Sequence, residues 1–362
     1  MVHAFKHCNV WWATRLACFA GLGVLNVAAS AQSAITIYGV ADSFVGRASG
    51  STSVMRVQEG GHIASQVGFK GTEDLGGGMS AGFVLEAGIA MDSGAGTVPG
   101  PGLAFTRQSF VSLGDANSWG TISMGRQYTP LFRTTWRADP FGNNTIFSPY
   151  ILWAQTDAQP NFQAWQARSD NSVLYTSPSS LPVSVSLMYA PGEAANSASG
   201  NYTGGSVSWT GGPLWAGAAF QKVRSGTAAA PVANPFTSTS NVVSASYEQG
   251  PWRLGGSVGS QGSNAPGSPK AKLWNLSAQY DISAQHRLMV GVGDRKVDGS
   301  MRGQRATVLG YHYMLSKRTD FYIRSYRLTN RGDAGVSLAQ IPINANSGAD
   351  GTHNAIGIVH RF

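Results

Sequence analysis

Residues 353–362, HNAIGIVHRF, form an alternating run at the end of the chain, and this run decides the fold. One row of this run holds Ile356, Ile358, His360 and Phe362, and the other holds Ala355, Gly357, Val359 and Arg361. Side chains that alternate in this way are typical of a β-strand. The backbone groups of a strand need a partner, and we expect residues 35–39, ITIYG, to pair with this one.

The same period of two recurs along the chain. In residues 274–282 the even positions are apolar and the positions between them are polar, and residues 183–189, 243–247 and 307–315 alternate in a similar way. A helical period is almost absent after the first 31 residues. The pattern therefore predicts strands with one apolar face.

The connections between these strands alternate in length. Tight turns fall at 75–78, 115–118, 211–213, 249–251 and 316–318, and long stretches rich in glycine, serine, alanine and proline fall at 91–104, 225–239, 261–270 and 330–351. A soluble antiparallel sheet shows the same side-chain alternation, but short connections on one rim and long ones on the other are typical of outer-membrane barrels. In hydrocarbon only a closed barrel leaves no unpaired strand edge. We expect an all-β fold, a transmembrane antiparallel β-barrel of about 16 strands.

The first 31 residues have the pattern of a secretory signal. Lys6 and Arg15 precede an apolar stretch, residues 16–29, that ends in the small-residue pattern Ala29-Ser30-Ala31. We expect residues 1–31 to be removed and residues 32–362 to form one barrel. Both cysteines lie in the first segment, so disulfides and thiol chemistry are not expected in the barrel.

Composition and motifs argue against several other classes of protein. The net charge is +8, but only 12% of residues are charged, and the basic ones are scattered, which disfavours a nucleic-acid partner. Residues 255–259, GGSVG, match the nucleophile motif of hydrolases, but no helical pattern follows them. The histidines lack the spacing of a metal site, and no phosphate-binding loop is present. We expect no enzyme activity, no cofactor and no metal.

Four stretches resemble the Gram-negative general porin family, the trimeric diffusion channels of the outer membrane. They are residues 37–42 (IYGVAD), 67–78 (VGFKGTEDLGGG), 119–127 (WGTISMGRQ) and 357–362 (GIVHRF). The resemblance implies a 16-stranded barrel that crosses the outer membrane beside lipid and lipopolysaccharide. It also implies that Phe362 is the signal read by the outer-membrane assembly machinery, and that the third external loop folds inward to narrow the channel.

The resemblance also implies which residues line this constriction. The loop corresponds to residues 127–166 and contains Asp139-Pro140-Phe141-Gly142, similar to a loop motif of the family. Arg107 and Arg168 match basic positions of the barrel wall, Asp139 matches the opposing loop acid, and Arg126 is a further candidate.

The sequence departs from the family pattern at two places. Gln66 stands where the family usually has an arginine, and the loop carries its own cations, Arg133 and Arg137, together with Trp136, Trp153 and Trp165. Opposed charges across a constriction orient polar solutes, and an excess of cations favours anions. We therefore expect a water-filled channel for small hydrophilic solutes and ions that prefers anions. A substrate-specific channel for anionic or aromatic solutes, and a barrel closed by its own loop, are the alternatives.

The resemblance implies a homotrimer, and we expect one strand row to offer a contact surface. Gln108 and Ser112 fall on the row of Phe110, which we expect to face outward. Polar residues on the outside are unfavourable against lipid but acceptable against a second copy of the chain.

Overall fold

The computed structural model describes residues 34–362, except 98–101, 103, 155–164, 333, 335, 339–340, 342 and 345–347. The proposed signal, residues 1–31, and the middle of the predicted constriction loop lie outside the described residues. No helix in the described part of the chain is long and apolar enough to span a membrane.

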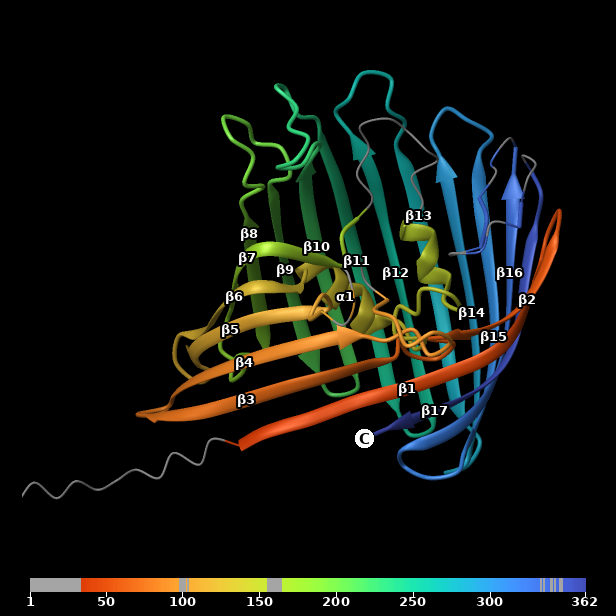
Figure 1. The fold of residues 1–362 in the computed structure, drawn as a ribbon, viewed down its shortest axis with the longest axis horizontal. Helices are drawn as coiled ribbons and strands as arrows, with labels where there is room; N and C mark the ends of the chain where they lie inside the picture. The colour runs from red at the N-terminus through yellow and green to blue at the C-terminus, as the bar shows by residue number, and fades with distance from the viewer. Residues whose placement is uncertain are drawn as a thin grey trace, which may run out of the picture. The chain divides into compact units, whose positions relative to one another are not determined.

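The described chain forms one antiparallel sheet of seventeen segments that closes on itself (Figure 1). The strands are β1 (Ala34–Ser49), β2 (Ser53–Glu59), β3 (Gln66–Gly76), β4 (Met79–Gly88), β5 (Gln108–Asp115), β6 (Gly120–Tyr128), β7 (Arg168–Thr176), β8 (Val183–Ala190), β9 (Tyr202–Gly211), β10 (Leu214–Arg224), β11 (Thr237–Gln249), β12 (Trp252–Ser263), β13 (Ala271–Asp281), β14 (His286–Val297), β15 (Gly303–Met314), β16 (Thr319–Arg331) and β17 (Gly351–Arg361). The tight turns and long connections alternate as the sequence predicts. The connection between β14 and β15, residues 298–302, is short although it lies at the end of the barrel that carries the long connections.

Strand β1 pairs on the same side with both β2 and β3, so these two segments occupy one strand position and the barrel has 16 positions. Residues 60–65 leave the sheet between them. Two backbone N–H groups of this excursion, those of His62 and Ile63, donate to Asp42 Oδ2 on β1, each over 2.7 Å. The excursion is therefore held against β1.

The barrel closes between β1 and β17, but not at the residues expected. Residues 35–39 pair with β3, and it is the second part of β1, from Val40 to Ser49, that pairs with β17. Gly39 and Phe362 still meet at the end of this seam, where each backbone N–H donates to the other's carbonyl oxygen over 3.0 and 3.1 Å. The predicted partner strand was correct and its paired segment was wrong, because β1 is longer than β17.

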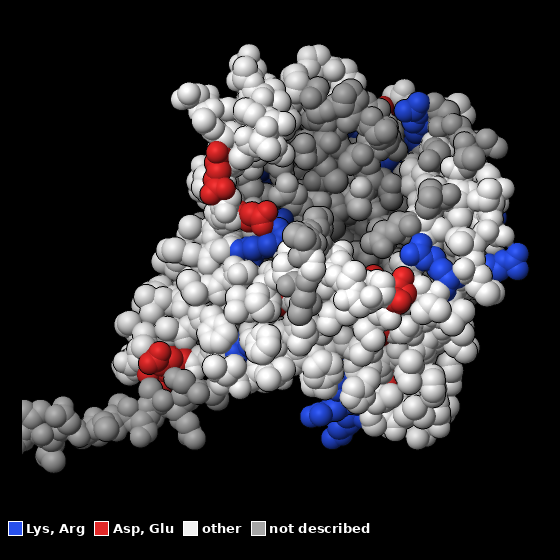
Figure 2. Space-filling model, viewed as in Figure 1, with Lys and Arg blue, Asp and Glu red and all other residues white. Residues whose placement is uncertain are grey.

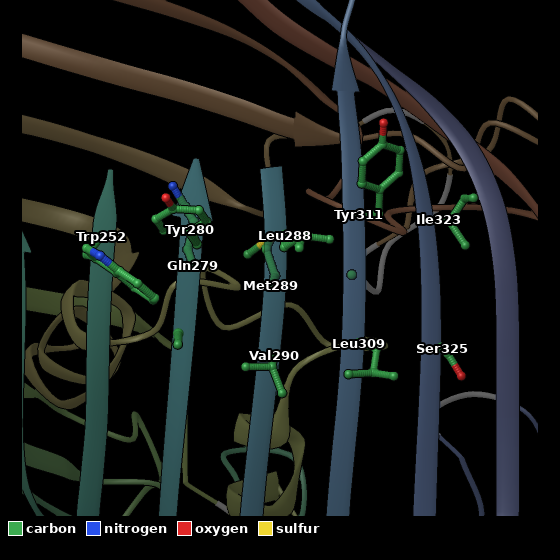
Figure 3. Close-up of a pocket in the computed structure, with 12 residues that line it drawn as sticks. Trp252, Gln279, Tyr280, Leu288, Met289, Val290, Leu309, Tyr311, Ile323 and Ser325 are labelled. Atoms are coloured by element: carbon green, nitrogen blue, oxygen red, sulfur yellow. The ribbon is translucent and has the colours of Figure 1, made fainter. Parts of the chain in front are cut away.

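The apolar rows face outward along the strands, as the alternation predicts. Side chains of Trp274 and Leu276 are exposed, while their neighbours Leu273 and Asn275 are buried. On β12 to β16 the outward side chains border a shallow apolar groove of about 530 Å³ (Figure 3). In Figure 2 charged side chains form a few small groups with wide uncharged areas of wall between them. This outer surface suits hydrocarbon.

One predicted row is reversed. On β5 Val111 and Leu113 are exposed on the outside, and Gln108 lies opposite Glu86, which faces inward. The row of Gln108, Phe110 and Ser112 therefore faces the lumen, and it is not an outer contact surface. A shift of one residue exchanges the two faces of a strand, and both rows of β5 mix polar and apolar residues.

The connection between β6 and β7 folds into the barrel, which confirms the inward loop. It contains α1 (Pro130–Ala138), which contacts β8 to β12, and the 3₁₀ helix η1 (Pro149–Ala154), which contacts β13 to β15. Thr129 caps α1 by accepting a hydrogen bond from the Phe132 N–H at 3.2 Å. Pro130 at the first helical position has no N–H to leave unpaired.

The loop packs against one side of the lumen. Its buried apolar residues, such as Phe147 and Trp153, join one cluster with inward side chains of β1 and β13 to β17. Glycines of the wall make room for the loop, because a Cβ at Gly255 would lie 1.8 Å from the carbonyl oxygen of Ala138. Ser257, in the hydrolase-like motif, lies within strand β12 and its hydroxyl lies 2.8 Å from that of Ser244. The glycines of this motif therefore serve loop packing.

Candidate pore constriction

Arg107, just before β5, is anchored on the lumenal side of the wall. Its Nε donates to Glu86 Oε1 at 2.8 Å, and both side chains are buried. The other Glu86 oxygen accepts from the hydroxyl of Tyr38 at 3.0 Å and from the amide of Gln66 at 3.2 Å. Gln66, at the position of the family's arginine, therefore contributes a neutral donor here and no charge.

Tyr128 joins the two predicted wall arginines. Its hydroxyl accepts from Arg107 Nη2 at 2.8 Å and from Arg168 Nη2 at 2.7 Å. The Arg168 guanidinium also lies 4.4 Å from the centre of the Tyr128 ring. Within the described residues no carboxylate forms an ion pair with Arg168. The structure thus brings Arg107 and Arg168 together and leaves the charge of Arg168 without a counterion among the described residues.

A group of aromatic rings links this wall to the inward loop. The ring of Tyr128 stacks on Phe132 of α1 at 4.7 Å, and Phe132 stacks on Trp165 at 5.7 Å. Tyr150 meets Trp165 edge-on at 4.7 Å. These contacts fix α1 against the arginine wall.

The exposed face of α1 carries three of the residues singled out in the sequence. Trp136 and Arg137 follow Arg133 by three and four positions and share one face of the helix with it. Leu131, Thr134 and Ala138 on the other side are buried. Trp136 is 53% exposed, whereas Trp153 and Trp165 are buried. No carboxylate in the described part of the chain pairs with Arg133.

Arg137 differs from Arg133 because it has an acidic partner. Arg137 Nη1 lies 2.5 Å from Glu248 Oε1, and Arg253 Nε lies 3.1 Å from the same oxygen. Two guanidinium groups therefore share one carboxylate, and this cluster keeps a net positive charge. Neither Glu248 nor Arg253 was identified from the sequence, because they lie on β11 and β12, far from the loop along the chain.

Asp139 does not face the lumen. It is 1% exposed, and its carboxylate accepts from the backbone N–H groups of Phe141 and Asn143 at 3.0 and 2.9 Å and from the Ser148 hydroxyl at 2.6 Å. Burial raises the pKa of the Asp139 carboxyl, and these hydrogen bonds oppose the increase. The acid of the loop motif therefore holds the turn after α1, and it is not an exposed acid opposing the wall arginines.

Arg126 lies outside the cluster. Opposite Ser109 on β5, it falls in the outward row of Met124 and Val111. It forms an ion pair with Asp170 at 2.5 Å, and the Asp170 side chain is 65% exposed. The register therefore removes Arg126 from the residues that line the constriction.

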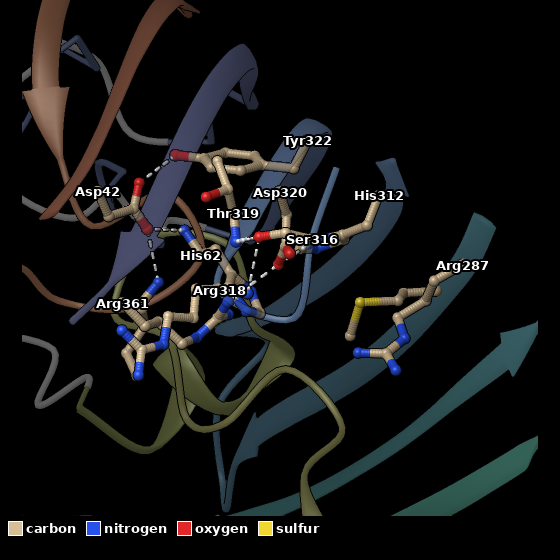
Figure 4. A network of polar contacts seen from close by, with 12 residues as sticks. Asp42, His62, Arg287, His312, Ser316, Arg318, Thr319, Asp320, Tyr322 and Arg361 are labelled. Carbon is tan, nitrogen blue, oxygen red and sulfur yellow. Dashed lines mark hydrogen bonds and ion pairs between the residues drawn. The ribbon is translucent and has the colours of Figure 1, made fainter. Parts of the chain in front are cut away.

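A second polar network lies on the opposite wall (Figure 4). Arg324 on β16 is fully buried, and its Nη2 lies 2.6 Å from His312 Nε2 and 3.1 Å from His62 Nδ1. Asp320 lies 3.6 Å from the other ring nitrogen of His312. Potential ligand atoms of His62, His312 and Asp320 lie within 4.8 Å of one another. The Arg324 guanidinium donates hydrogen bonds to one ring nitrogen of each histidine. Its positive charge also disfavours the binding of a metal cation at these three residues.

The sequence matches a family model described as a Gram-negative porin over residues 17–333. Outer membrane porin protein 32 of Delftia acidovorans is 29% identical over 358 residues, which cover 92% of this chain and 96% of that one. Major outer membrane protein P.IB of Neisseria gonorrhoeae is 33% identical over 193 residues, covering 50% of this chain and 49% of that one.

Solved structures agree with the sequence comparison. The anion-selective porin from Comamonas acidovorans has a TM-score of 0.80 and 26% identity, covering 91% of this chain and 100% of that one. OmpT of Vibrio cholerae in a trimer form has a TM-score of 0.66 and 15% identity, covering 91% and 99%, and at this identity the likeness concerns the fold alone. The family match, the relatives along most of the chain and the closed barrel with its inward loop agree, and the chain belongs to the Gram-negative porin family, as an outer-membrane barrel that forms a channel.

Proposed function

We propose that the channel prefers anions and that Arg168 and Arg133 carry this preference. The supporting observation is that these two guanidinium groups flank the Tyr128–Phe132 stack and that neither has a carboxylate partner among the described residues. Arg107 contributes less, because Glu86 neutralises it. The porin of Comamonas acidovorans, described as anion-selective, supports the same preference.

The physical basis is electrostatic. Fixed charges in a narrow aqueous passage with low-dielectric walls raise the local concentration of counterions. A cation fixed there without a counterion attracts chloride or a carboxylate from the water. Two described acids of this region, Glu86 and Glu248, are each held by arginines, so they oppose this field weakly.

The experiment is a reversal-potential measurement across a potassium chloride gradient, with the refolded protein in a planar bilayer. We expect a chloride-leaning potential, and a clear decrease in its magnitude in the Arg133→Gln/Arg168→Gln variant. Arg126→Gln removes the same type of charge from the outward row and serves as the control. A wild-type channel that favours potassium, or a control that shifts as much as the double variant, would contradict the proposal.

A second candidate function is a channel selective for aromatic anions. The observation that favours it is the exposed indole of Trp136 on the same helix face as Arg133, since an aromatic carboxylate can stack on one and pair with the other. Benzoate would then block chloride current at lower concentration than acetate does. Equal block by the two anions, or block that Trp136→Ala does not change, would contradict the aromatic-anion channel. The general porin would then be the one remaining function of the two.

We also propose that the chain is exported with residues 1–31 removed, that it assembles as a homotrimer, and that it has no catalytic function. The ion pair of Arg126 and Asp170 on the outside of the barrel suits a protein neighbour better than hydrocarbon, which supports the trimer. Phe362, 52% exposed at the seam, is proposed as the residue that the assembly machinery reads. Unheated gel electrophoresis with chemical cross-linking would reveal the trimer, and the amino-terminal sequence of the purified protein would reveal the cleavage site.

A further inference from the structure

The excursion at residues 60–65, which leaves the sheet between β2 and β3, lies on the inner side of the wall. The ring of His62 reaches Arg324, a buried inward residue of β16, whose Nη2 lies 3.1 Å from His62 Nδ1. Ile63 packs against the same buried apolar cluster that the inward loop joins. The excursion is therefore a second element inside the barrel, next to the inward loop.

The excursion is fastened to the wall at several points. Asp42 on β1 accepts hydrogen bonds from two backbone N–H groups of the excursion and from the Tyr322 hydroxyl (Figure 4). Ser65 is fully buried, and its hydroxyl donates to the Asp42 carbonyl oxygen and accepts from the Asp42 N–H, each over 2.9 Å. At Gly61 there is no room for a side chain, because a Cβ would lie 2.8 Å from Phe44 Cδ1 and closer still to the Tyr322 hydroxyl. The position of the excursion is thus fixed by the wall.

Asn144 of the inward loop joins the loop to the excursion. Its side-chain Nδ2 donates to the carbonyl oxygens of Gly60 and His62, at 2.8 and 3.0 Å. Its Oδ1 accepts from the backbone N–H groups of Ile146 and Phe147, at 2.9 and 2.6 Å. A carboxamide has two N–H donors and two acceptor lone pairs, so this buried side chain uses its full hydrogen-bonding capacity. It holds two segments of the chain at a fixed distance from each other.

These two bonds are the polar link between the wall and residues 139–148, which we name the central segment of the loop. Its other described hydrogen bonds stay within the inward loop, as the bond from the Ser148 hydroxyl to Asp139 does. Among the described residues, the hydrogen bonds that connect the central segment to the rest of the barrel are those from Asn144. Its apolar side chains also pack on the wall, but apolar packing is not directional.

We propose that the excursion holds the central segment on the packed side of the lumen, and that Asn144 is the positioning residue through which it acts. Held in this way, the segment stays away from the arginine wall at β5 to β7, and the passage remains open. When the Asn144 amide loses its two carbonyl partners, the segment is free to move toward that wall, and the passage narrows for a short time. This role concerns the opening of the channel and does not depend on its ion preference.

The test uses two substitutions that break the contact from its two sides. N144D keeps the oxygen that accepts from the loop backbone but loses both donated hydrogen bonds, and it turns a carboxylate toward two carbonyl oxygens. G61A leaves Asn144 unchanged and pushes the excursion away from Tyr322. Recording at pH 8 keeps the new carboxyl of N144D ionised. Heat-modifiable migration on a gel verifies that each variant folds.

N330D is the matched control. Asn330 at the end of β16 is 7% exposed, as Asn144 is, and its Nδ2 also donates to two carbonyl oxygens, those of Val336 and Ala349, at 2.9 and 2.6 Å. These carbonyls belong to the connection between β16 and β17 and not to the inward loop. The control therefore makes the same chemical change in a similar setting away from the excursion.

Single-channel currents in a planar bilayer give the fraction of time that the channel spends in closed or reduced-conductance states. We expect this fraction to rise about tenfold in N144D and in G61A, and N330D to behave as the unmodified protein does. The double variant G61A/N144D should show no further rise, because both changes break one contact. If the double variant does not fold, hydrogen exchange at residues 139–148 in the two single variants takes its place, and it should be faster in both.

Three results would overturn the proposal. An unchanged closed fraction in N144D means that apolar packing alone positions the central segment. An equal rise in N330D means that the closures report a general loss of stability. Effects of N144D and G61A that multiply in the double variant, or unchanged hydrogen exchange in the single variants, mean that the excursion does not act through Asn144.

Discussion

The two sides of the lumen are built by opposite means. Against β1 and β13 to β17 the inward loop is packed by apolar contacts, and the polar groups there, Asp42 and Arg324 among them, are fully buried. At β5 to β7 a few polar contacts around Tyr128 hold the guanidinium groups of Arg107 and Arg168 on the lumenal side of the wall. The first side holds the loop by apolar packing, and the second, where Tyr128 also stacks on Phe132 of α1, supplies the charge that solutes meet.

The residues that hold the inward loop in position are therefore largely separate from those that set the ion preference of the channel. A change on the packed side is expected to act on stability and conductance together. A change at Arg168 is expected to act on ion preference with little effect on folding, whereas Arg107, which pairs with the buried Glu86, also contributes to stability. The following four predictions test this separation, starting with the largest expected effect.

Phe147→Ala should cost the most. The ring is fully buried and lies 5.6 Å from Phe44 and 4.8 Å from His353. Removing a buried phenylalanine side chain lowers the free energy of unfolding by about 3–5 kcal/mol. Denaturant unfolding in detergent measures the loss. The exposed Trp136→Ala is the control on the same loop, and an equal loss in both variants would mean that the loop is not anchored by this cluster.

Asp42→Ala should have an effect of comparable size. It leaves the N–H groups of His62 and Ile63 and the hydroxyl of Tyr322 without their acceptor. Each buried group left unpaired costs about 1–3 kcal/mol. The free energy of unfolding should fall, and hydrogen exchange at residues 60–65 should become faster. Unchanged exchange there would show that the excursion is held by other contacts.

Arg168→Gln and Arg107→Gln should differ in their effect on stability, although each removes one charge. A unit charge at close range is worth about 1 kcal/mol even in bulk water, so Arg168→Gln should lower the chloride preference up to about fivefold without destabilising the barrel. Arg107→Gln leaves the buried Glu86 unpaired, and it should lower both stability and chloride preference. Equal unfolding curves for the two variants would contradict this assignment.

Glu248→Gln should produce the smallest change, and in the opposite direction. It frees the charges of Arg137 and Arg253 and should raise the chloride preference. Its side chain is 41% exposed, so the effect on the free energy of unfolding should stay below about 1 kcal/mol. Reversal potentials and unfolding curves measure the two effects, and a lower chloride preference would exclude this role.

Much of the barrel could be predicted from the sequence because the strand period and the lengths of connections report directly on local geometry. Residues 274–282 alternate clearly, and their apolar row does face outward. The row of Phe110 was predicted wrongly because Gln108, Phe110 and Ser112 are hardly more polar than Ser109, Val111 and Leu113. Only pairing with β4 and β6 decides between those rows.

The candidate site was less predictable because its contacts join distant parts of the chain. Motif resemblance found Arg107 and Arg168, but the shared Tyr128 hydroxyl became visible only when β5, β6 and β7 came together. The motif also identified Asp139 as a candidate site residue. Its carboxylate accepts hydrogen bonds from Asn143 and Ser148 in the turn after α1, and the sequence does not show how that turn folds. His62 and His312 are 250 positions apart, and no spacing rule connects them.

The excursion at residues 60–65 also bears on how such a barrel tolerates insertions. Val40 pairs with Gln66, and Ser43 pairs with Glu59. Between these two pairs β1 spans three residues and its partner spans seven, so the partner contains an excess of four residues. An even excess leaves the two halves of the interrupted strand in phase, so Gln58 and Gln66 lie on the same face. An odd excess would exchange the two faces of one half of the strand, so that its lumenal side chains would point into lipid. Length changes at this place are therefore tolerated in steps of two, and a deletion of four residues should merge β2 and β3 into one continuous strand.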